Sequence, residues 1–146
     1  MFERILVPTD LSDFSLPALQ CAKSFAGARI TLLHANRFAS SMYLEHPLGF
    51  YLDDSPAPKR ALQQRLRAIA REHFEGVHDV ETLVVDDEPA HAIAQAADDV
   101  GADLIIMATH GRGGSITRRV MERTSRPILA VGGTPPRPVT RATKRP

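Results

Sequence analysis

The stretch DLIIMATHGRGGS, residues 103–115, decides how the rest of the chain is interpreted. It opens with an unbroken apolar run, Leu104 to Ala108, which is typical of a short strand buried on both faces. A glycine-rich turn follows at once, and after Ser115 the apolar residues recur at helical spacing. A strand, a glycine-rich turn and a helix start point free backbone N–H groups and a helix dipole at an anion. The same glycines could serve only to make a tight turn, so phosphate binding and a plain connection are both open.

Short apolar strands and helix-like stretches alternate along the rest of the chain. Strands are predicted at 5–8, 30–34, 80–85, 104–108 and 127–131, and helices at 16–25, 62–74, 89–100 and from Ser115 to Thr124. This alternation indicates the α/β class, with a parallel sheet covered by helices on both faces. Residues 36–58 form a long connection with many large apolar side chains, for which a lid over a site and a dimer contact are both open.

Length and composition limit the classes of protein to consider. A chain of 146 residues is expected to form one domain, 1–133, followed by a basic, proline-rich tail at 134–146 that we expect to be disordered. The net charge of +1 gives no reason to expect a nucleic-acid partner. No apolar run approaches the roughly 20 residues of a membrane span, and the start of the chain has no signal-peptide pattern. We therefore expect a cytoplasmic protein with no membrane partner.

Ligands of such sheets bind outside the carboxyl ends of the strands, where the strand order reverses. The groups predicted there are Pro8-Thr9-Asp10, Ala35-Asn36 and Met107 to Ser115. Asp10 is interpreted as a ligand residue, with a helix cap or an ordered turn as the alternative.

Other polar residues are given structural roles. His34 and His110 are interpreted as hydrogen-bonding residues of the fold, and the acidic run at 86–88 as the start of a helix. His73 and His78 lack the spacing of a zinc site, so no metal is expected.

Four motifs together resemble the universal stress protein family. They are ILVPTDLS at 5–12, LLH at 32–34, DLIIMATHGR at 103–112 and RPILAV at 126–131. The resemblance extends from Arg4 to Val131. It implies one five-stranded parallel sheet of order 3-2-1-4-5, a Rossmann-like fold of the adenine nucleotide alpha-hydrolase type. It also implies a small cytoplasmic stress-response protein that forms a homodimer through its last strand, in a family with one branch that binds ATP and one that does not.

The ATP-binding branch carries the motif G-x2-G-x9-G-S/T after its fourth strand. Here Ala108 stands at the first glycine and Gly111 at the second, and Gly114-Ser115 matches the closing pair. Only Arg112 and Gly113 lie between them, so the phosphate loop is shortened and we expect ATP or AMP to bind weakly. The resemblance assigns the nucleotide contacts to Pro8, Thr9, Asp10, Ala35, Met107, Ala108, Gly111, Gly114, Ser115 and Ile116.

Two functions stay open after this comparison. The first is a regulatory protein with an adenine-nucleotide site, and the second is a dimeric stress protein that binds no ATP and acts through protein partners. A phospho-acceptor receiver domain is disfavoured, because Asp10 has no acidic neighbour and Gly132, not a lysine, follows the last strand. No nucleophile–base pair is visible, so we expect no catalytic residue and at most a very slow ATPase.

The last predicted strand suggests how two copies associate. Residues 128–131 are apolar and include no charged side chain that would protect an exposed sheet edge. We therefore expect an isologous homodimer in which this strand pairs with its copy.

Overall fold

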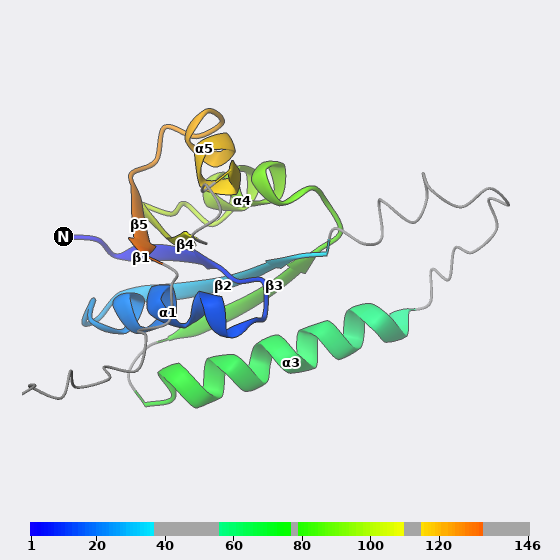
Figure 1. Cartoon of the computed structure of the whole chain (residues 1–146). Helices are drawn as coiled ribbons and strands as arrows, with labels where there is room; N and C mark the ends of the chain where they lie inside the picture. The colour runs from blue at the N-terminus through cyan, green and yellow to red at the C-terminus, as the bar shows by residue number, and fades with distance from the viewer. Residues whose placement is uncertain (37–55, 77–78, 110–114, 133–146) are drawn as a thin grey trace, which may run out of the picture.

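The computed structural model describes residues 1–36, 56–76, 79–109 and 115–132. Five parallel strands form one sheet of order β3-β2-β1-β4-β5, as predicted (Figure 1). The strands are β1 (Arg4–Pro8), β2 (Arg29–Ala35), β3 (Val80–Val85), β4 (Leu104–Thr109) and β5 (Ile128–Gly132). The helices are the short 3-10 helix η1 (Asp13–Ser15), α1 (Leu16–Lys23), α3 (Pro56–Phe74), α4 (Pro89–Asp99) and α5 (Ser115–Met121).

Helices cover both faces of the sheet, α1 and α3 on one and α4 and α5 on the other (Figure 1). Neighbouring residues of β1 point to opposite faces, as in any strand. Ile5 and Val7 therefore join the core under α1 and α3, while Leu6 joins the core under α4 and α5. All three are at most 1% exposed, and each contributes about 1.5–3 kcal/mol through burial of its side chain.

The sheet is most buried at its centre, where β1 pairs with β2 on one side and β4 on the other. The chain passes from β1 outward to β2 and β3, then returns to the far side of β1 for β4 and β5. The order of the strands thus reverses between β1 and β4. This reversal is the switch point where ligands bind in open α/β sheets.

The boundaries of several elements differ from the predicted ones. The long connection ends at residue 55, because α3 begins at Pro56, and proline is favoured in the first helical turn. The first helix begins through η1 and ends at Lys23, so Phe25 lies beyond it. Likewise Thr124 lies beyond α5, although its N–H still bonds the Val120 carbonyl. The predictions for 37–55 and for the tail at 134–146 fall outside the described residues.

In the described part of the chain, no helix combines the length and the apolar character needed to cross a membrane.

Candidate functional site

The carboxyl ends of β1, β2 and β4 meet at one edge of the sheet, which we call the carboxyl edge (Figure 1). The first predicted group, Pro8-Thr9-Asp10, leaves β1 at this edge. The Thr9 N–H donates to the Leu33 carbonyl of β2 over 2.8 Å, so the pairing with β2 continues one residue past β1. The structure therefore brings the ends of β1 and β2 together, as the sequence predicted.

Thr9 stabilises the turn that follows β1. The residue is 7% exposed, and its hydroxyl oxygen accepts the Leu11 N–H over 3.0 Å. His34 Nδ1 lies 3.0 Å from the Thr9 carbonyl oxygen. Because a carbonyl oxygen only accepts, Nδ1 is the donor in this hydrogen bond. The structural role predicted for His34 is therefore confirmed.

The carboxylate of Asp10 orders the same turn. Its Oδ1 accepts from the Ser12 N–H at 2.9 Å, from the Ser12 hydroxyl at 2.5 Å and from the Ser15 hydroxyl at 2.9 Å. Asp10 nevertheless lies exposed at the carboxyl edge. The turn-ordering role is thus observed, and the role toward a ligand stays a prediction that this position allows.

Two features of this turn were not predicted from the sequence. Leu11 has a φ of 67°, a left-handed conformation that leucine rarely adopts. Its carbonyl oxygen accepts a hydrogen bond from the Arg65 guanidinium of α3 over 2.9 Å. The sequence does not indicate the conformation of Leu11, because leucine is not a typical turn residue. It does not indicate the bond either, because the two residues are 54 positions apart.

The other residues assigned to nucleotide contacts differ in where the structure places them. Ala35 and Ala108 are half-buried near the ends of β2 and β4. Met107 is 4% exposed and packs in the core under α4 and α5, against which Ile116 is also partly packed. Ser115 is the first residue of α5. Gly111, Gly114 and the predicted structural residue His110 lie outside the described residues.

The acidic run at 86–88 leads directly into α4, which begins at Pro89, as predicted. Glu88 is the N-cap: its carboxylate accepts from the Ala90 and His91 N–H groups, each at 3.1 Å. The Arg119 guanidinium of α5 lies 2.6 Å from the same carboxylate. This contact, which we call the Glu88 clamp, ties the start of α4 to α5. The start of α5 is the helix end to which the resemblance assigns the phosphates.

The surroundings of Asp87 and Glu88 favour the ionised form of both carboxyl groups. A hydrogen bond from the His91 side chain, supported by the Glu88 N–H, lowers the pKa of Asp87. Partial burial acts to raise the pKa of Glu88, but the His91 and Ala90 N–H groups and the Arg119 charge together lower it. No cluster of three or more metal-ligating side chains occurs within the described ranges.

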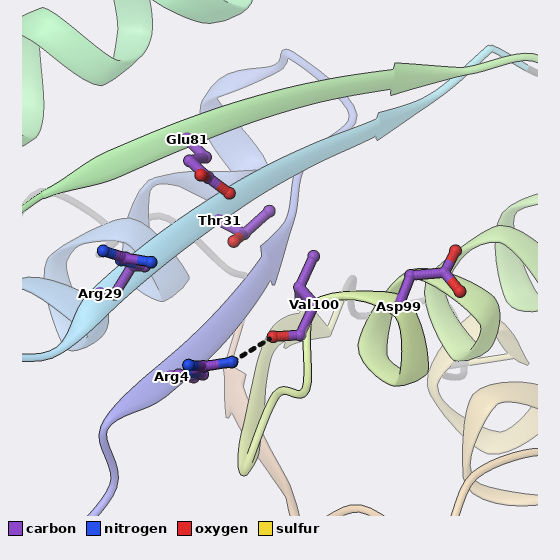
Figure 2. A pocket seen from close by; sticks show the side chains of 6 residues that line it. All are labelled: Arg4, Arg29, Thr31, Glu81, Asp99 and Val100. Carbon is purple, nitrogen blue, oxygen red and sulfur yellow. Dashed lines mark hydrogen bonds between the residues drawn. The ribbon is translucent and has the colours of Figure 1, made fainter.

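A small hollow of about 170 Å³ lies at the opposite, amino edge of the sheet (Figure 2). Its walls are formed by Arg4, Arg29, Thr31, Glu81, Asp99 and Val100. Both arginines already have partners, since Arg29 pairs with Asp79 and Arg4 donates to the Val100 carbonyl. The two basic and two acidic side chains balance in charge. The hollow also lies at the amino ends of the strands, whereas the ligand is predicted at the carboxyl edge. We assign it no ligand.

Comparison with known proteins gives one consistent family. The sequence profile described as "Universal stress protein family" matches residues 1–132. A universal stress protein of Thermus aquaticus, from the QAH/OAS sulfhydrylase 3' region, is 34% identical over 90% of this chain and 99% of its own length. Universal stress protein MJ0577 of Methanocaldococcus jannaschii is 27% identical over 90% of this chain and 95% of its own.

Solved structures agree with these sequence matches. The structure of protein MJ0577 superposes with a TM-score of 0.71 and 26% identity, and covers 90% of this chain and 96% of that one. A universal stress protein solved in complex with cAMP superposes with a TM-score of 0.61 and 25% identity over 91% of this chain and 98% of that one. The predicted sheet order is thus the order of this family.

Proposed function

The chain belongs to the universal stress protein family, and we propose that it is a cytoplasmic stress-response regulator that binds an adenine nucleotide at the carboxyl edge. The observation that carries the proposal is the place of the Asp10 turn. It lies where β1 adjoins β2 and where the strand order reverses toward β4. A relative of the same fold has been solved with cAMP, which makes an adenine nucleotide the natural ligand class to test.

In this proposal, the adenosine and the phosphates of the nucleotide contribute separately to the binding free energy. Of the residues assigned to adenosine, Asp10 and Ala35 lie at the carboxyl edge, whereas Met107 is buried two residues before the end of β4. For the phosphates, the sequence keeps the two ends of the glycine motif but only Arg112 and Gly113 between them. Each charge-assisted hydrogen bond lost with the missing loop costs about 1.5–3 kcal/mol. We therefore propose weak ATP binding with little preference for ATP over AMP, and no catalysis beyond a very slow ATPase.

Calorimetric titration with AMP, cAMP and ATP tests this function. AMP should bind, and ATP should bind no more than about tenfold more tightly. An Asp10→Asn variant should lose about tenfold or more in AMP affinity, because an uncharged amide forms weaker hydrogen bonds with the ligand than a carboxylate does. The matched control is Glu81→Gln in the hollow at the amino edge, which should bind AMP as the natural chain does. No binding of any adenine nucleotide at millimolar concentration would reject the proposal.

We also propose that two copies associate through β5. In the described sheet, β5 pairs only with β4, so its other edge is unpaired. Its side chains support an interface, since Leu129 is 39% exposed and Ala130 is also exposed. Pairing with a second copy would cover both the apolar side chains and the free edge.

A specific observation favours the second function, action through a protein partner. Arg60, Arg67 and Arg71 are exposed along one side of α3, and we call them the arginine stripe. Arg67 and Arg71 are four residues apart, a spacing at which like charges repel on a helix. None of the three forms an ion pair with another described residue. A partner segment rich in carboxylates would relieve this repulsion, because the guanidinium fork matches a carboxylate.

A further inference from the structure

The turn after β1 contains an unusual backbone conformation. Leu11 is the one non-glycine residue with a positive φ, 67°, among those that the structure describes. In this conformation the Cβ atom crowds the backbone, so a leucine stays there only if its surroundings hold it. Strained residues of this kind gather at ligand sites, and this one is next to Asp10.

Three contacts hold Leu11 in place. The residue is 8% exposed, and its side chain packs in the core under α1 and α3. Its N–H donates to the Thr9 hydroxyl over 3.0 Å. Its carbonyl oxygen accepts from the Arg65 guanidinium over 2.9 Å. The first two contacts come from the turn and the core beneath it, whereas the third comes from α3.

The conformation of Leu11 contributes to the placement of the Asp10 carboxylate. Asp10 and Ser12 flank Leu11, and the bonds from the Ser12 N–H and hydroxyl to Asp10 Oδ1 span it. If Leu11 rotated to an ordinary extended conformation, the Ser12 N–H would turn away and these bonds would break. The Asp10 carboxylate would then lose two of the bonds that place it at the carboxyl edge, and the bond from the Ser15 hydroxyl would remain.

We infer that Arg65 is a positioning residue for the nucleotide site, because its bond to the Leu11 carbonyl holds the turn that presents Asp10. The inference rests on the proposed function of the carboxyl edge. A bond from a charged donor is stronger than a neutral one, so the Arg65 contact is well suited to oppose the strain at Leu11. It also makes α3, which has no residue among the assigned contacts, a part of the site.

The test compares Arg65→Met with Arg67→Met, a matched change two residues further along α3 where the arginine has no described partner. Arg65→Met should weaken AMP binding about tenfold by lowering the fraction of molecules whose turn is competent to bind. It should also speed amide hydrogen exchange at residues 10–12 in the protein without nucleotide. Arg67→Met should change neither quantity, and Arg65→Lys should recover part of the affinity.

The place of the exchange effect separates positioning from general stability. In Arg65→Met, exchange should speed at residues 10–12 but not at the paired amides of β2, whereas a general loss of stability would speed exchange at both. If the natural chain binds no adenine nucleotide, the proposed function fails, and the exchange at residues 10–12 still decides the inference. Unchanged exchange at residues 10–12 in Arg65→Met would overturn it, and so would unchanged AMP affinity in this variant when the natural chain binds AMP.

Discussion

Replacing Glu88 with alanine should lower stability by about 1.5 kcal/mol. The variant loses the N-cap of α4, where the carboxylate accepts two N–H groups, and loss of a cap costs about 0.5–2 kcal/mol. It also loses the contact with Arg119, but these two side chains are 34% and 43% exposed, so solvent screening leaves only about 0.2–1 kcal/mol for this pair. For a chain of this length, the melting temperature should fall by about 3–6 °C.

The pH dependence follows from the lowered pKa of Glu88. A carboxyl group whose pKa is lower in the folded than in the unfolded state stabilises the fold above its unfolded value, here 4.5. That contribution is lost as the pH falls through the folded value. Glu88→Gln, which keeps an acceptor oxygen but no charge, should therefore be less stable than the natural chain at pH 7. The difference between the two should shrink below about pH 4.5.

Thermal unfolding followed by circular dichroism at pH 7 and below pH 4 measures both effects. The control is Glu122→Ala, which removes a more exposed pair with Arg118, of 64% and 82% exposure, and should change the melting temperature little. The reasoning is refuted if Glu88→Ala is no less stable than Glu122→Ala at pH 7. A difference between Glu88→Gln and the natural chain that stays constant with pH would contradict the charge argument.

Three further predictions concern assembly, the tail and the partner surface. Leu129→Lys should give monomers or insoluble protein, since it places a charge on the proposed dimer edge; an unchanged dimer mass by light scattering would contradict the interface. Deleting 134–146 should leave the melting temperature nearly unchanged, because this proline-rich segment has little apolar surface to bury; a large fall would show that it docks on the domain. A synthetic glutamate-rich helical peptide should bind the natural chain in a salt-dependent way, and changing Arg60, Arg67 and Arg71 to glutamate should abolish it; equal binding by both would reject the arginine stripe.

Much of the fold was predictable because it depends on local patterns. The apolar runs of β1 and β4 and the residues at helical spacing in α3 and α4 each indicate one element type, and the alternation of types fixes the parallel sheet. The sheet order came from the family resemblance. The ends of α1 and α3 were harder, because they depend on caps and on Pro56, where local signals compete.

The candidate site was predictable in position but not in detail. The rule for parallel sheets places Asp10 and Ala35 at the same edge, and both lie there. The bond from Arg65 to Leu11 and the Glu88 clamp were not foreseen, although Glu88 was correctly placed at a helix start. Each joins elements that are far apart in sequence, and no periodic pattern encodes which of many surface arginines will reach a given oxygen.

The two ends of the longest connection are attached to one carboxylate. Asn36, just before this segment, donates to Asp86 Oδ1 over 3.2 Å, and Lys59, in the first turn of α3, lies 3.7 Å from Asp86 Oδ2. Side chains from both ends of this segment therefore meet at this one carboxylate, which follows β3. Doubling a loop whose ends are already held together costs only about 0.6 kcal/mol of closure entropy. We therefore expect an insertion between these two ends to leave the sheet intact. A loss of ligand binding or of dimers on such an insertion would assign the segment one of the two roles left open for it.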